Sequence, residues 1–304
     1  MEIQLAVKIL LFFSMFGALY SALLLPTGLW KDTKIGKKIY QKKKRSPLKE
    51  KLLRNPGETL RKQEREIAID RMLAMTSLYF VTVIFIIAVL LTPERYKTAS
   101  LLVELLFTGL YTVFYFAFFR KIKNHSASLR HISLGLDGEL ATAQALNQLM
   151  RHGYYVYHDF PADKFNIDHI VIGKTGIYAV ETKTKSKQNI KGTEAANVSY
   201  DGNVLNFPDG GNTEFIRQAK EQAKWLSKFL RESIGKQVFV TPVLALPGWM
   251  VNYRTTDDSL IVINPKMCEG VITARRNMVD ETTITQVKYQ IEKECRTVEP
   301  YEIL

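Results

Sequence analysis

Charged residues stand at the ends of two neighbouring apolar segments that have the alternation of β-strands. The stretch 166–187 reads NIDHIVIGKTGIYAVETKTKSK, and alternate side chains of a strand point to opposite faces. Glu181 and Lys183 therefore share a face at the end of the second strand. The turn at 173–176 predicts a hairpin, which places Asp168, at the start of the first strand, beside them. The pattern predicts two carboxylates and one ammonium group in a single site.

A third acid lies on the helix that is expected before these strands. Residues 133–153 are amphipathic and end at a glycine, and Glu139 stands four positions before Ala143 on the apolar side. An acid at the edge of a buried face needs a partner. A first-turn glutamate favoured by the helix dipole would explain Glu139 without any site, just as a surface ion pair would explain the charges at the strand ends.

Three carboxylates close together would suit a hard divalent cation. Mg²⁺ and Mn²⁺ accept carboxylates, backbone carbonyls and water as ligands, so we expect Glu139, Asp168 and Glu181 to be the metal ligands. Lys183, on the same strand face, would orient or help to deprotonate a water that attacks a phosphodiester. These residue types predict metal-dependent hydrolysis of nucleic acid.

The surrounding elements predict an α/β domain with a mixed sheet flanked by helices. Strands are expected at 154–160, 167–173, 176–183, 197–202, 203–207, 237–249 and 259–265. Helices are expected at 133–153, 213–235 and 281–294. The two cysteines, Cys268 and Cys295, have no metal-binding spacing, which indicates free thiols.

The helix at 213–235 carries a stripe of basic residues at steps of three and four. An ordinary solvated face and a surface that follows phosphates both explain this stripe, which consists of Arg217, Lys220, Lys224, Lys228 and Arg231. The phosphate interpretation adds the lysines that follow the second hairpin strand, Lys185, Lys187 and Lys191. It predicts nucleic acid as the partner.

The first 124 residues differ from the rest in being rich in long apolar stretches. Three stretches approach the roughly 20 residues that cross a bilayer, at 5–25, 72–91 and 100–119. We therefore predict a membrane region at 1–124 with three transmembrane helices and a second, soluble domain at 125–304.

The basic residues predict the orientation of these spans. The chain has a formal net charge of +12, but residues 31–71 carry 15 basic and 6 acidic residues, whereas 132–304 carry 20 and 21. Basic loops stay in the cytoplasm. The sequence thus predicts a multi-pass protein of the cell inner (plasma) membrane, with the loop 31–71 and the C-terminal domain in the cytoplasm. The basic loop could also bind anionic lipid or nucleic acid, although topology alone explains it.

Three segments in order resemble a known family. GLDGE (135–139), NIDHIVIG (166–173) and GIYAVETKTKS (176–186) resemble the NERD, or nuclease-related domain, family of the PD-(D/E)xK nuclease superfamily. The resemblance implies a restriction-endonuclease-like core and a Mg²⁺-dependent nuclease site. Matched position by position, it assigns catalytic roles to Glu139, Asp168, Glu181 and Lys183. Gln218 resembles the glutamine of the superfamily's next helix, which helps to hold metal or DNA.

Three classes of function are open from the sequence. A membrane-anchored nuclease that acts on DNA, such as foreign DNA near the membrane, is the main expectation. A catalytically silent module that binds nucleic acid or protein is the alternative, since the soluble part is nearly neutral and DNA-binding domains are usually more basic. A transporter or sensor built on the spans has little support, because Glu104 is the one acid within them.

Overall fold

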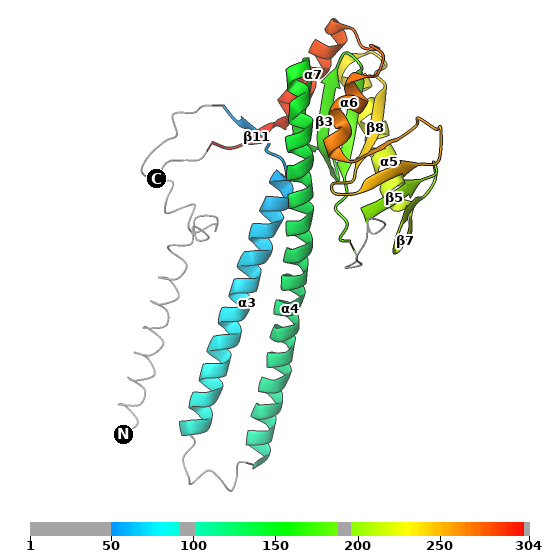
Figure 1. Ribbon diagram of the computed structural model, residues 1–304. Helices are drawn as coiled ribbons and strands as arrows, with labels where there is room; N and C mark the ends of the chain where they lie inside the picture. Colours follow the sequence, from blue (N-terminus) through cyan, green and yellow to red (C-terminus); the bar gives the residue numbers. More distant parts are fainter. Residues whose placement is uncertain (1–49, 92–100, 188–195, 301–304) are drawn as a thin grey trace. The chain divides into compact units, whose positions relative to one another are not determined.

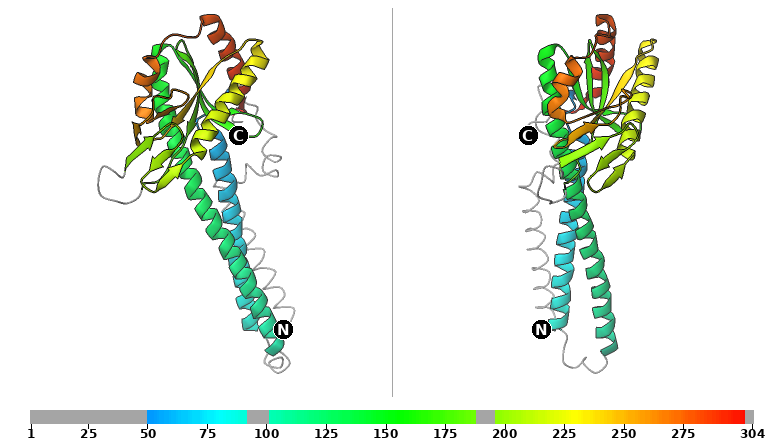
Figure 2. Two further views of the ribbon diagram at one scale, coloured as in Figure 1. Left: turned by 90° about the vertical axis from the view of Figure 1, so that its right-hand side faces the viewer. Right: turned by 45° about the vertical axis from the view of Figure 1, so that its right-hand side comes forward.

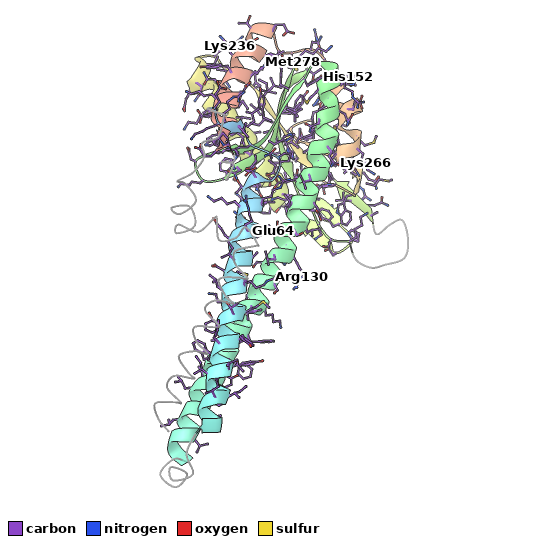
Figure 3. The ribbon with its side chains drawn as sticks, turned by 90° about the vertical axis from the view of Figure 1, so that its left-hand side faces the viewer. Glu64, Arg130, His152, Lys236, Lys266 and Met278 are labelled. Atoms are coloured by element: carbon purple, nitrogen blue, oxygen red, sulfur yellow. The ribbon has the colours of Figure 1, made fainter. Side chains whose placement is uncertain are left out.

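The computed structural model describes residues 50–91, 101–187 and 196–300, and Leu52–Val298 form one compact unit. Two long helices and an α/β domain make up this unit (Figure 1). The helices α3 (Glu58–Leu91) and α4 (Leu101–Leu146) pack along each other. The rings of Phe85 and Tyr111 stack between them at 4.1 Å. Glu64 of α3 and Arg130 of α4 mark the part of this helix pair that leads to the α/β domain (Figure 3).

A five-stranded mixed sheet forms the centre of the α/β domain, in the order β10-β8-β4-β3-β2. The pairs β2–β3 and β3–β4 are antiparallel, whereas β4–β8 and β8–β10 are parallel. The five strands are β2 (Tyr155–Pro161), β3 (Asn166–Gly173), β4 (Gly176–Thr182), β8 (Val240–Ala245) and β10 (Ile261–Ile263).

Helices cover both faces of this sheet (Figure 2). On one face, α5 (Glu214–Ile234) and α7 (Glu281–Cys295) pack on Ile177 and Ala179 of β4. On the other face, the end of α4, the 3-10 helix η2 (Asn147–His152) and α6 (Cys268–Thr273) pack on Tyr178 and Val180. A second 3-10 helix, η4 (Pro265–Met267), leads into α6. The alternation expected for β4 therefore directs Glu181 towards α5.

Two smaller sheets complete the unit. A four-stranded sheet in the order β7-β6-β5-β9 packs its apolar side chains on the first half of α5. Its strands are β5 (Asn197–Tyr200), β6 (Leu205–Phe207), β7 (Gly210–Asn212) and β9 (Met250–Tyr253). The short strands β1 (Leu52–Leu53) and β11 (Arg296–Val298) pair antiparallel, so the chain just before α3 is joined to the end of the domain.

The predicted mixed sheet flanked by helices is confirmed. Gly153 ends η2 at a φ of +81°, and Gly235 ends α5 at +74°, a left-handed conformation that glycine adopts without strain. The sequence missed the strands β1, β7, β9 and β11 and the helix α6. The predicted helix 133–153 consists of the end of the longer helix α4, which runs without a break through residues 124 and 125, followed by η2.

The prediction of three membrane-spanning helices is not supported as it stands. Among the described residues, one helix, Glu58–Ile87, is long and apolar enough to cross a bilayer. The predicted span 72–91 falls within α3, and residues 101–119 of the span predicted at 100–119 form the first part of α4. The span predicted at 5–25 lies outside the described residues.

Candidate active site

The β3–β4 hairpin brings Asp168 beside the end of β4. The turn pairs Gly173 with Gly176, and the register continues to His169 opposite Val180. One step further, Oδ2 of Asp168 accepts a 2.7 Å hydrogen bond from the backbone N–H of Thr182. This bond fixes one oxygen of the Asp168 carboxylate at the strand end.

Glu181 is the most enclosed acid of the site, with 2% of its surface exposed. Its Oε1 lies 2.7 Å from Nζ of Lys183. Its Oε2 accepts a 2.6 Å hydrogen bond from Nε2 of Gln222 on α5. The ammonium group of Lys183 also lies 5.6 Å from the ring centre of Phe215. Strand β4 and helix α5 thus hold the Glu181 carboxylate from two sides.

Glu139 comes to the same site from α4. It is 8% exposed, and its Oε2 has no hydrogen-bond partner among the residues that the structure describes. The preceding residue, Gly138, allows this approach, because a Cβ there would lie 1.6 Å from Oγ1 of Thr184. A glycine in the GLDGE segment is therefore needed for α4 to pass close to the end of β4.

The three acids affect one another electrostatically. Burial raises the pKa of Glu139 to about 7, and the charges of Asp159 and Glu181 add to the rise. Burial, followed by the charges of Glu181 and Glu139, raises the pKa of Asp168 well above its usual range. Lys183 opposes both rises. Among the described residues, Lys183 is the cation that acts on both Glu139 and Asp168, which leaves these carboxylates short of positive charge.

The donor chemistry of this cluster fits a hard divalent cation. Carboxylate oxygens are the ligands that Mg²⁺ and Mn²⁺ prefer, and a cation would satisfy the unpartnered buried oxygen of Glu139. The carboxylates do not stand in ligand geometry, however. Within the described ranges, no group of three or more His, Cys, Asp or Glu side chains lies close enough to hold a metal ion.

The glutamine that contacts the acids is Gln222. Its Nε2 donates to Glu181 and, at 3.3 Å, to the carbonyl of Asn166. Gln218, to which the sequence assigned this role, lies one helical turn earlier on α5 and is half-buried. Both amides occur on the same side of the predicted helix, four positions apart, so the helical pattern alone does not show which of them contacts the acids.

The basic residues separate into two groups. Arg217 is held by Glu214 and Glu221 of its own helix, and Lys185 pairs with Asp209 at 2.8 Å. Lys187 lies over the Trp249 ring, 5.7 Å from its centre. The other stripe residues line a groove of about 710 Å³ whose wall includes Trp225 and Phe239: Lys220, Lys224, Lys228 and Arg231. Lys191 lies outside the described residues.

A further buried acid, Asp159, was not singled out by the sequence. It lies in β2 at a φ of +51° and is 3% exposed. Arg54 and Thr59, which precede and begin α3, bind its Oδ2, and Asn166 donates to its Oδ1 at 3.2 Å. The α3 partners are about 100 residues away in the chain, and no periodic pattern connects them with Asp159.

This fold and site define an α/β domain in which carboxylates and a lysine meet at the end of a sheet hairpin. Residues 134–247 match the family model of NERD, the nuclease-related domain, so the predicted resemblance is confirmed. The match contains Glu139, Asp168, Glu181 and Lys183. A search of curated proteins and a search of solved structures gave no match.

Proposed function

We propose that the chain is a metal-dependent nuclease that hydrolyses phosphodiester bonds, most readily those of DNA, and that its apolar helices anchor it in a membrane. The NERD match supports a nuclease-like activity. The observation that carries the proposal is the meeting of Glu139, Asp168 and Glu181 with Lys183, because buried acids short of positive charge are characteristic of functional sites.

The three acids share one role in the proposed reaction, and Gln222 and Lys183 have others. Glu139, Asp168 and Glu181 would hold Mg²⁺ or Mn²⁺, which supplies Lewis acidity to a phosphate oxygen when bound. Gln222 keeps the Glu181 carboxylate in one orientation through its 2.6 Å hydrogen bond. Lys183 orients the attacking water and stabilises negative charge that develops on the phosphate.

The bonds exchanged are those of simple hydrolysis. The oxygen of a water molecule forms a bond to phosphorus, and the bond between phosphorus and one sugar oxygen breaks. One proton of the water leaves during attack, and the departing sugar oxygen gains a proton. Lys183 lies 2.7 Å from the Glu181 carboxylate, so its ammonium group is held beside the acids rather than free in solvent.

The exposed surface of the long helices supports the membrane anchor. Large apolar side chains that are rarely left in water follow one another on both helices: Leu73, Met75, Tyr79, Ile84 and Ile86 on α3, and Leu105, Leu106, Leu110, Val113 and Phe116 on α4. The proposal extends to a multi-pass protein of the plasma membrane with residues 31–71 and the α/β domain in the cytoplasm. Labelling of cysteines placed at position 96 and at the exposed position 203 from outside intact cells tests this, since label at 203 alone would reverse the orientation.

Cleavage by the purified full-length chain tests the nuclease proposal. Circular DNA, linear DNA and RNA are each incubated with Mg²⁺, with Mn²⁺ or with EDTA, and Glu181→Gln is compared with the parent. We expect DNA cleavage that requires the metal and is lost in Glu181→Gln. Cleavage that persists in EDTA, or that the variant retains, would contradict the proposed site.

A catalytically silent binding module is the second candidate. It is favoured by the contacts of Glu181, since Lys183 and Gln222 already occupy both of its carboxylate oxygens, and by the absence of a ready metal cluster among the described residues. In that case the chain binds nucleic acid equally well with Mg²⁺ or with EDTA and leaves it uncut.

A further inference from the structure

The segment that leads into α3 is bound to the α/β domain by three kinds of contact. Leu52 and Leu53 pair with β11, and the backbone N–H of Arg54 donates to the carbonyl of Cys295 at 3.0 Å. The side chains of Arg54 and Thr59 then bind Asp159. Residues 54–59 lie outside the part of the chain that matches NERD, yet they contact its interior.

Asp159 is the centre of these contacts. Its Oδ2 accepts from Nε of Arg54 at 2.9 Å, from the backbone N–H of Thr59 at 3.0 Å and from Oγ1 of Thr59 at 2.9 Å. The pair of charges is enclosed, with side-chain exposures of 16% for Arg54 and 4% for Asp159. Charge-assisted bonds in such an enclosed place fix the geometry of both partners.

A continuous line of hydrogen bonds leads from Asp159 to the acids. Nδ2 of Asn166 donates to Oδ1 of Asp159 and to Oγ1 of Thr59. The carbonyl of Asn166 accepts from Gln222, whose same Nε2 donates to Glu181. Asn166 begins β3, two positions before Asp168, so it connects the entering segment with both strand acids.

Gly57 approaches the third acid directly. Its backbone N–H faces the Glu139 carboxylate and opposes the rise in the pKa of that acid. A Cβ added at Gly57 would lie 3.5 Å from Oε2 of Glu139 and 2.3 Å from Cδ1 of Leu136. Gly57 has a φ of +68°, so both the conformation and the space at this position favour glycine.

We infer that residues 54–59 belong to the carboxylate site and position its acids, although they precede the nuclease-related domain in the chain. Arg54 and Thr59 are positioning residues that act through Asp159 and Asn166 on the Gln222–Glu181 pair. Gly57 positions Glu139. The inference rests on the proposed nuclease function and adds to it that the segment entering the first described helix completes the hydrolytic centre.

The test uses the full-length chain with the variants Thr59→Val, Arg54→Lys and the pair Arg54→Gln/Asp159→Asn. The double variant removes both charges together, which avoids an unpaired buried charge that could unfold the protein. Lys62→Ala, at an exposed position on the same helix, is the matched control. Mn²⁺ binding is followed by electron paramagnetic resonance, and kcat and KM are measured for cleavage of linear DNA.

We expect Thr59→Val and the double variant to lose about 10- to 100-fold in Mn²⁺ affinity or kcat, the effect usual for residues that orient metal ligands, with KM unchanged. Arg54→Lys should recover part of the loss, and Lys62→Ala should match the parent. A cleaving parent whose Thr59→Val and double variants keep parental kcat and Mn²⁺ affinity overturns the inference alone. A parent that neither binds Mn²⁺ nor cleaves overturns the proposed function and the inference with it.

Discussion

Asp159 and Glu139 are both buried acids of one domain, but their surroundings are opposite. Asp159 is 3% exposed and receives hydrogen bonds from Arg54, Thr59 and Asn166. Glu139 is 8% exposed, faces two other acids, and has one oxygen without a partner among the described residues. A satisfied buried acid fixes a junction between elements, whereas an acid short of positive charge is ready to bind a cation.

At the carboxylate site that contains Glu139, Lys183→Ala should have the largest effect on the rate of cleavage. It removes the ammonium group that lies 2.7 Å from the Glu181 carboxylate, so the chemical step should slow by roughly 10²- to 10⁴-fold. Metal affinity should hold or rise, because a competing cation is gone. Single-turnover cleavage and calorimetric Mg²⁺ binding measure the two quantities separately.

The matched control for Lys183 is Lys174→Ala, at an exposed position in the β3–β4 turn. It should behave as the parent in both measurements. Asp168→Asn and Glu181→Gln should differ from Lys183→Ala by losing metal affinity together with rate. A Lys183→Ala protein as fast as the parent would remove Lys183 from the mechanism.

Around the hydrogen-bonded Asp159, Arg54→Ala should have the largest effect, and this effect is on the stability of the fold. Asp159 would keep its burial and lose its cation, and breaking one partner of a buried pair costs about 3–5 kcal/mol of unfolding free energy. Urea unfolding of the full-length chain measures this loss. Lys62→Ala is the control, and an Arg54→Ala chain of parental stability would show that Thr59 and Asn166 suffice for Asp159.

Glu139→Gln should make the stability of the folded chain depend less on pH than the stability of the parent does. The pKa of Glu139 is about 7 in the folded chain against 4.5 ordinarily, so the folded state holds more protons between these pH values. Folding stability therefore falls as pH rises from about 4.5 to about 7. The contribution of Glu139 to this loss is up to about 3 kcal/mol, at 1.36 kcal/mol for each pKa unit. Glu139→Gln should remove that contribution and leave the part that the raised pKa of Asp168 adds.

Urea unfolding in EDTA at pH 5 and pH 8 measures this difference for Glu139→Gln and the parent. Asp137→Asn, at an exposed position on the same helix, should leave the pH dependence unchanged. If Glu139→Gln loses as much stability as the parent between the two pH values, the acids do not repel one another in the way that the geometry indicates.

The basic groove gives the smallest expected effect. Replacing Lys220, Lys224 and Lys228 by Gln should lower the slope of log affinity against log salt for duplex DNA by about 0.9 for each phosphate that the protein no longer neutralises. Arg217→Gln should leave the slope unchanged, because Glu214 and Glu221 already hold that guanidinium group. Equal slopes for the triple variant and the parent would identify the groove as an ordinary solvated surface.

Local patterns in the sequence were sufficient for the hairpin and for the neighbourhood of its acids. A period of two places Glu181 and Lys183 on one face, and a four-residue turn fixes the register that brings Asp168 to Thr182. The position of Glu139 needed the family resemblance as well, because a helix dipole explains an early glutamate equally well.

Interactions between distant segments could not be predicted in this way. Asp159 has a positive φ within a strand, and its partner Arg54 lies 105 residues away, so no local period connects the two. The sequence predicts a boundary between the membrane region and the soluble domain at residues 124 and 125, within the polar stretch 120–132. The structure shows one helix there, because these residues interrupt the apolar pattern without interrupting helical hydrogen bonding.

Because α4 is one unbroken helix, its length fixes the distance between its apolar stretch and the acids of the proposed enzyme. Phe119, the last residue of the apolar stretch, and Glu139 are twenty positions apart in the same helix. At a rise of 1.5 Å per residue, they span about 30 Å. If the apolar turns lie in lipid, as proposed, the acids would stand about this far from the bilayer. Each helical turn inserted or deleted between these residues would then change the distance between the acids and the bilayer by about 5.4 Å.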